Sequence, residues 1–149
     1  MKKLSVFVMG LAMMFTNNVM AQTTTTIDGV VYTLEGETYT LTNGKGVTNP
    51  DLVIPSAIEG KPVTKVAASA FFDGSNYSNN LTSLVIPASI ESIGNAAFRK
   101  CGSLAKITFE AGSKLKAIND LVFCQNSKLK AVVIPASVES IGGNGFGRD

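Results

Sequence analysis

The sequence has no histidine and only two cysteines, which narrows the chemistry open to the protein. Without histidine there is no His-based catalytic triad, and the commonest general base is missing. Two cysteines without histidine do not make a metal site. The glycine-rich residues 142–145 lack the lysine and the preceding strand of a phosphate-binding loop. The sequence therefore predicts a protein without enzymatic activity and without a cofactor.

The chain also lacks an apolar run of membrane-spanning length near its start. Residues 4–15 are apolar, whereas a membrane helix needs roughly 20 such residues. Lys2 and Lys3 precede this run, and Val19-Met20-Ala21 follows it. This layout is typical of a secretory signal peptide that is cleaved after Ala21. We expect residues 1–21 to be a signal peptide, the protein to be secreted or held at a cell surface, and no membrane span to remain.

Clusters of like charge are missing as well. The chain has 13 lysines and arginines against 11 acidic residues, and two of the lysines leave with the leader. The remaining 11 basic and 11 acidic residues balance, without a basic run. Nucleic acid, which binds through clustered positive charge, is therefore not an expected partner.

What the sequence does contain is a repeat. Residues 85–94 read VIPASIESIG and return as VIPASVESIG at residues 133–142, with Ile90 replaced by Val138. A divergent copy, residues 104–123, lies between them, and a further copy occupies residues 52–71. Leucines at 81, 104 and 129 are 23 and 25 residues apart, within the period of about 20–29 residues of leucine-rich repeats.

Each copy has apolar residues at three places. A β-branched run such as Leu84-Val85-Ile86 or Val132-Val133-Ile134 predicts a short strand, and a following proline ends it. A pair of aliphatic residues three apart comes next, and a phenylalanine closes the copy. These phenylalanines are Phe71, Phe98, Phe123 and Phe146. Stacked copies bury such positions as continuous ladders, which a single copy cannot do.

The residues before the first copy have a different pattern. Residues 30–34 and 38–42 alternate apolar with polar side chains across Glu35-Gly36-Glu37, which predicts a β-hairpin. Terminal repeats need a polar outer face, so the hairpin is expected to cover the first copy. The threonines at 23–26 are expected to be disordered.

The copy from Leu81 to Cys101 follows the pattern L-x-x-[LV]-x-I-P-x-S-[IV]-x-x-I-G-x-x-A-F-x-x-C. This pattern closely resembles the BspA-like leucine-rich repeat family over residues 30 to 149. The resemblance implies a β-rich solenoid with short strands, short helical or 3-10 turns and an N-terminal hairpin cap. It divides the chain into a signal peptide at 1–21 and a repeat domain at 22–149, with the cap at 22–50 and about four repeats at 51–149.

The same resemblance implies a function. Members are secreted or surface-displayed, most often bacterial, and named members are adhesins for host or bacterial proteins. We therefore expect non-enzymatic protein–protein binding by this chain, including adhesion. The alternative is a structural or self-assembly module without a ligand, or a fragment of a longer repeat protein.

The strand face is the usual binding surface of a solenoid. Because side chains alternate along a strand, two columns are expected to point outward. Together with Tyr77, an aromatic residue in the loop at 76–82, they give the candidate protein-binding residues Asp51, Tyr77, Ser83, Val85, Lys106, Thr108, Ala131 and Val133. Neither column contains the aromatic or arginine anchors that dominate binding energies.

Glu91 and Glu139 occupy equivalent positions two copies apart, about 10 Å from each other at about 4.8 Å per strand step. This spacing is near the wide limit for an inverting glycosidase. Lys116 is expected between them, and its charge would lower both carboxylate pKa values, which is wrong for a general acid. A structural ladder of alternating charges is the favoured interpretation.

The two cysteines allow a disulfide in an exported protein, but two buried thiols are favoured. Cys101 lies three residues after Phe98, whereas Cys124 lies one residue after Phe123, so they fall in different columns. Asn76 and Asn80 begin two glycosylation sequons, which matter only in a eukaryotic secretory pathway.

The last copy has no successor. An unpaired strand with apolar neighbours is a template for another chain. We expect residues 129–149 either to mediate self-association or to fray.

Overall fold

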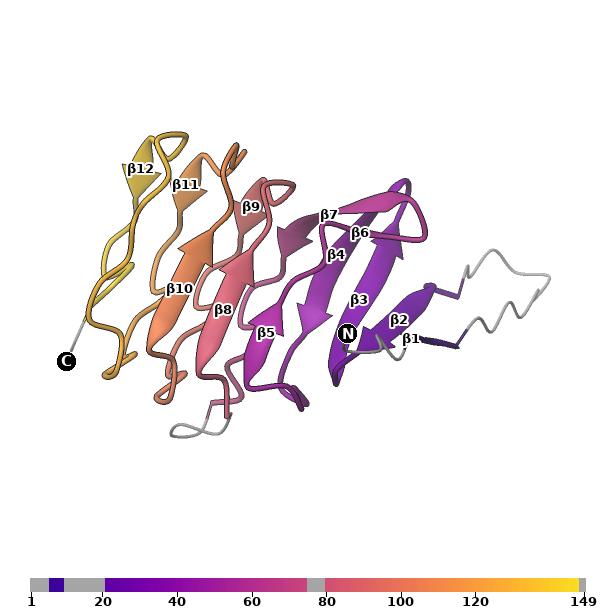
Figure 1. The fold of residues 1–149 in the computed structure, drawn as a ribbon, viewed down its shortest axis with the longest axis horizontal. Helices are drawn as coiled ribbons and strands as arrows, with labels where there is room; N and C mark the ends of the chain where they lie inside the picture. Colours follow the sequence, from indigo (N-terminus) through magenta and orange to yellow (C-terminus); the bar gives the residue numbers. More distant parts are fainter. Residues whose placement is uncertain (1–5, 10–20, 75–79, 148–149) are drawn as a thin grey trace.

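The structure, a computed structural model, describes residues 21–74 and 80–147, and residues 6–9 by their backbone. The chain forms a β-solenoid of about four turns, with its layers stacked along one axis (Figure 1). Its strands, in chain order, are β1 Val6–Met9, β2 Thr24–Ile27, β3 Val30–Glu35, β4 Thr38–Asn43, β5 Asp51–Val53, β6 Ala57–Ile58, β7 Lys61–Val66, β8 Ser83–Ile86, β9 Ser92–Ile93, β10 Lys106–Phe109, β11 Ala117–Ile118 and β12 Ser140–Ile141.

A β-hairpin covers one end of the stack, as the alternation in residues 30–42 predicts. β3 and β4 pair antiparallel, and β4 pairs in parallel with β7 of the first repeat. Tyr32, Tyr39 and Leu41 turn inward and are buried. Burial raises the pKa of the Tyr32 phenol well above its ordinary value, and the nearby charge of Asp28 adds to the rise. The hairpin is therefore part of the core as well as a cap.

The expectation of disorder at the threonines 23–26 is wrong. Residues 24–27 form β2, which pairs antiparallel with β3, and Thr25 is buried. Threonine is β-branched and fits a pleated strand once a neighbouring strand offers its edge. On its other side β2 pairs antiparallel with β1, which lies in the expected signal peptide.

One side of the solenoid is a parallel sheet in the order β10-β8-β5. The register places Asp51 opposite Ser83 and Ser83 opposite Lys106. Leu84 and Ile86 point inward and are buried, as the alternation along the strand predicts. β5 and β8 stop shortly before Pro55 and Pro87, which cannot donate to the ladder.

A second side is built by two-residue strands in which β9 follows β7 and β12 follows β11. The four predicted phenylalanines lie next to one another in successive turns. Neighbouring rings stack with centroids 4.7 Å apart for Phe71–Phe98, 5.6 Å for Phe98–Phe123 and 5.3 Å for Phe123–Phe146. Phe98 is fully buried between its two neighbours. The phenylalanine ladder predicted from the repeat is therefore confirmed.

The sequence-based prediction of the turns and of the last copy needs two corrections. Among the described residues, tight turns replace the expected helical segments, and no helix is found. Residues 131–135 are not a strand, although β8 with nearly the same sequence is one. Among the described residues, the last copy has a neighbouring layer on one side only, so this segment buries less apolar surface and is held less firmly against β10. β10 therefore ends its sheet with one unpaired edge.

Candidate binding face

The predicted outward columns lie on the β5-β8-β10 side of the solenoid, which we call the strand face. In the first column, the Ser83 hydroxyl donates to the Asp51 carboxylate over 2.8 Å, and the Thr82 hydroxyl donates to the same oxygen over 3.1 Å. These polar groups therefore satisfy one another across neighbouring copies. Lys106 continues this column at the exposed start of β10.

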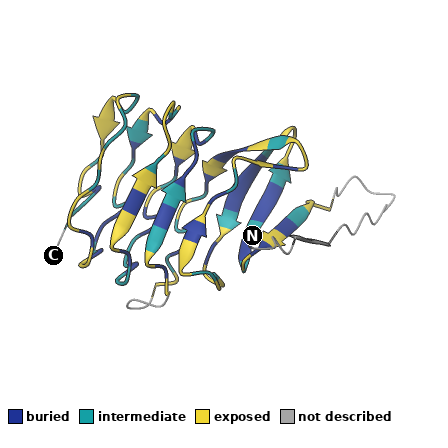
Figure 2. Cartoon of the chain, in the orientation of Figure 1, coloured by how far each residue is buried: buried dark blue, intermediate teal, exposed yellow. Residues whose placement is uncertain are grey.

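The second column is mostly apolar. Val53, Val85 and Thr108 lie opposite one another on adjacent strands. Val53 is 58% exposed and Val133 is 85% exposed, whereas Val85 is half-buried. Figure 2 shows exposed and half-buried positions alternating with buried ones along β5, β8 and β10. The face thus presents a row of short apolar side chains to water.

A groove of about 600 Å³ runs along the free edge of β10. Residues 106–113 form one wall, and residues 131–133 and 135–137 form the other. Four of the predicted residues line it together: Lys106, Thr108, Ala131 and Val133. The repeat pattern does not predict this groove, because it predicts a paired strand at residues 131–135, where the structure has an unpaired segment.

The other predicted residues lie apart from the groove. Asp51, Ser83 and Val85 lie on the strands that precede it in the stack. Tyr77 and the first sequon at Asn76 fall outside the described residues. Half of the candidate residues therefore line the groove, and the other described candidates lie on the same strand face.

The predicted column of charges forms in part, and its ion pair fits a structural role. The Lys116 ammonium lies 2.9 Å from a carboxylate oxygen of Glu139, and both side chains are exposed. Within the described part of the chain, Glu91 makes no ion pair, so only half of the predicted column forms. An exposed pair of this kind contributes little, about 0–1 kcal/mol.

The two cysteines are buried, and no disulfide joins them. The Lys100 N–H donates to the Cys124 carbonyl, and the Gln125 N–H donates to the Gly147 carbonyl. Lys100 and Gln125 are therefore equivalent, which puts Cys101 and Asn126 in one column and Cys124 in another. This arrangement agrees with the favoured interpretation of two separate buried thiols.

Asn126 is a buried polar residue that the repeat pattern did not mark. Its side chain donates to the Phe98 carbonyl of the preceding copy over 3.1 Å. Counting three residues onward from Phe98 and from Phe123 would have aligned it with Cys101. Over residues 6–9, 21–74 and 80–147, no group of three or more potential metal ligands and no helix fit to span a membrane is found.

Comparison with known proteins gives a family. A family model described as "BspA type Leucine rich repeat region" matches residues 55–148 in six copies. No curated protein matches the chain.

Solved structures resemble it along most of its length. A leucine-rich repeat protein from Bacteroides capillosus superposes with a TM-score of 0.67 at 30% identity, over 79% of this chain and 86% of the other. One from Bacteroides ovatus gives 0.66 and 26%, over 82% of this chain and 32% of that one. A leucine rich cell surface protein from Faecalibacterium prausnitzii gives 0.64 and 28%, over 81% and 33%. The chain spans about a third of these last two proteins.

Proposed function

The chain belongs to the BspA-type leucine-rich repeat family, and from this premise we propose that it is a non-enzymatic protein-binding module that acts outside the cytoplasm. One similar structure is of a protein named for the cell surface. The leader-like residues 1–21 support the same location. Adhesion to host or bacterial surface proteins is the form of binding we expect.

The observation that carries the proposal is the apolar strand face beside the groove. Val53 and Val133 are among the most exposed large hydrophobic side chains of the described residues. Exposed apolar side chains that form a row, rather than scattered single ones, mark surfaces that meet a partner. The free edge of β10 adds backbone N–H and C=O groups that an extended segment of a partner can pair with.

Chemical catalysis has much weaker support on this face. Its described side chains are valine, threonine, serine and alanine, with Lys106 and Asp51 as the charged members. The Asp51 carboxylate already accepts hydrogen bonds from Thr82 and Ser83, which fits a structural role.

A binding assay with matched variants tests the proposal. Immobilised protein is offered to purified host and bacterial surface proteins, and the Val133→Asp variant is compared with Lys65→Glu. Both positions are exposed, but Lys65 lies on β7, outside the strand face. We expect binding to at least one surface protein, weakened at least about tenfold by Val133→Asp alone. Absence of any binding, or equal loss in both variants, contradicts the proposal.

A structural module that assembles without a ligand is the second candidate. One specific observation favours it: the end of the stack opposite the hairpin has apolar side chains that no layer of the described chain covers. Self-association through residues 129–149 would follow from that end.

A further inference from the structure

The turn that follows β10 is longer than its counterparts in the neighbouring copies. Six residues separate Phe109 from Lys116, whereas four separate Ile86 from Glu91 in the preceding copy. The longer turn includes residues 110–113, all of which line the groove. The groove therefore lies between two described copies, and part of its wall is particular to the third copy.

This turn is bonded to the preceding copy and stands apart from the following one. The Lys114 N–H donates to the Ala88 carbonyl over 3.1 Å, and the Ala88 N–H donates to the Glu110 carboxylate over 3.3 Å. Among the described residues, no backbone hydrogen bond joins residues 110–114 to residues 135–137. The groove therefore has walls that do not bond to each other.

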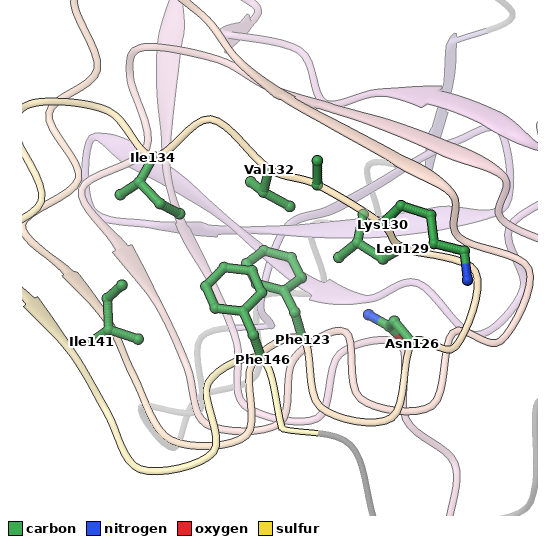
Figure 3. A pocket seen from close by; sticks show the side chains of 9 residues that line it. Phe123, Asn126, Leu129, Lys130, Val132, Ile134, Ile141 and Phe146 are labelled. Atoms are coloured by element: carbon green, nitrogen blue, oxygen red, sulfur yellow. The ribbon is translucent and has the colours of Figure 1, made fainter.

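Residues 131–135 belong to the opposite wall and are held by their side chains, although their backbone is unpaired. Val132 and Ile134 pack against the core, and Figure 3 shows both directed toward the Phe123 and Phe146 rings. The backbone of this segment does not pair with β10. The wall is thus anchored from the inside, and the edge of β10 beside it stays open.

The open edge of β10 presents backbone groups at alternate residues. In a parallel sheet, successive residues of a strand bond to opposite neighbours. The Glu110 N–H donates to the Ile86 carbonyl over 3.0 Å, so the even-numbered residues bond to β8. The N–H and C=O groups of Ile107 and Phe109 therefore face the groove, and within the described part of the chain they have no hydrogen-bond partner. An extended segment pairs with such groups as an added strand.

The side chains of the groove determine which segment fits. Lys106 is exposed and makes no ion pair within residues 6–9, 21–74 and 80–147. The Glu110 carboxylate, by contrast, already accepts from the Ala88 N–H. An acidic residue opposite Lys106 would gain a cross-strand attraction. The apolar side chains that line the rest of the groove include Ile107, Phe109, Ala131 and Ala136.

We infer that the groove binds an extended segment of a protein partner as a strand added to β10. The segment is about as long as β10, with an acidic residue opposite Lys106 and β-branched apolar residues beside Ile107 and Phe109. Its remaining side chains point away from the groove, because side chains alternate along a strand. This binding mode rests on the proposed protein-binding function and adds the form of the partner.

Titration of the purified protein with synthetic peptides tests the added strand. The probe is a blocked hexapeptide in which valine and threonine alternate after a glutamate. Its reverse sequence is offered as well, because an edge accepts parallel and antiparallel strands. We expect saturable binding of at least one peptide, with slower amide exchange at Ile107 and Phe109. Exchange at Glu110, which already donates to Ile86, should not change.

Matched changes in the peptide and the protein separate backbone pairing from charge. The same peptide methylated at every backbone nitrogen keeps its side chains but cannot donate, so it should not bind. Replacing its glutamate by lysine should weaken binding about two- to fivefold, and Lys106→Glu should reverse this preference. Lys65→Glu, an exposed change on β7, is the control that should leave the preference unchanged. Circular dichroism establishes that both variants are folded.

Failure of both peptides to bind overturns the inference, as does binding that survives methylation or leaves Ile107 and Phe109 unprotected. Slow exchange at these two amides in the free protein also overturns it, because residues 131–135 would then close on β10. An unchanged preference in Lys106→Glu overturns the acidic residue.

The binding assay with purified surface proteins gives an independent result. If surface proteins bind and the peptides do not, the proposed function stands and the added strand is wrong. If the peptides bind and no surface protein does, the groove accepts a strand and the proposed function fails.

Discussion

Residues 85–94 and 133–142 have the same sequence apart from one aliphatic exchange, yet they lie in different surroundings (Figure 2). Val85 belongs to β8 and is half-buried, while Val133 is unpaired and almost fully exposed. Ile93 is completely buried, whereas Ile141 is half exposed. In the part of the chain that the structure describes, the first copy has a layer on both sides, and the second has a layer on one side. Burial is therefore a property of the stack and not of the ten residues.

Some backbone hydrogen bonds are the same in both copies. The Glu91 N–H donates to the Thr64 carbonyl, and the Glu139 N–H donates in the same way to Lys116, both over 2.8 Å. Both bonds run to the preceding copy, which each segment has. Other contacts with the preceding copy differ: β8 pairs with β5, whereas residues 131–135 do not pair with β10. The same ten residues therefore keep some of their backbone contacts in both places and lose the strand pairing in the second.

The largest effect is expected from the phenylalanine ladder. Phe98→Ala should cost about 3–5 kcal/mol, because it leaves a cavity between two stacked rings. Phe146→Ala should cost about 1–2 kcal/mol, because this ring is half-buried and stacks on one side only. Denaturant unfolding measures both. Equal losses of unfolding free energy for the two variants would contradict the predicted difference between inner and outer layers.

The isoleucine pair tests the same point with identical side chains. Ile93→Ala should lose about 2–5 kcal/mol of unfolding free energy. Ile141→Ala should lose less than about 1 kcal/mol, because half of its side chain is already in water. Thermal or denaturant midpoints at concentrations that keep the protein monomeric give the difference. A loss at Ile141 that matches the loss at Ile93 would mean that this end of the stack is covered in the monomer.

Two glycines should respond alike. A methyl group on Gly94 would lie 2.4 Å from the Ala68 nitrogen, and one on Gly142 would lie 2.8 Å from the Asp120 nitrogen. Both clashes are with the backbone of the preceding copy, so Gly94→Ala and Gly142→Ala should each cost about 1–3 kcal/mol. Gly143→Ala is a control, since only the Asp120 side chain approaches that position. If Gly142→Ala is harmless, the last copy is not held against its predecessor as described.

The smallest effect concerns the ion pair between the last two copies. Lys116→Glu replaces an attraction to Glu139 by repulsion and should destabilise by about 1 kcal/mol, less at high salt. Lys114→Glu, an exposed change two residues away, should have little effect. Unfolding at low and high ionic strength measures both. A loss that does not depend on salt would show that packing, rather than charge, explains the Lys116 effect.

The sequence predicts the layers well because the same apolar positions recur in each copy. The period, the inward Leu84 and Ile86, the phenylalanine ladder and the hairpin all follow from local pattern. The structure departs from the pattern at residues 24–27 and 131–135. Whether these segments form strands depends on what lies beside them: β3 gives residues 24–27 a partner, while residues 131–135 are covered on one side only.

The candidate binding face was predictable in part for the same reason. Alternation along the strands placed Lys106, Thr108, Ala131 and Val133 outward, and all four line the groove. The groove exists because residues 131–135 stand away from β10, which no pattern within one copy indicates.

Amide hydrogen exchange in the two matching segments tests the central claim most directly. The amides of residues 84–86 lie in a paired inner strand, and those of residues 132–134 lie in an unpaired outer segment. In the monomer, we expect residues 132–134 to exchange far faster, at rates near those of local opening rather than global unfolding. Exchange of residues 132–134 as slow as that of residues 84–86 would contradict the account, because the last copy would then be as well held as an inner one.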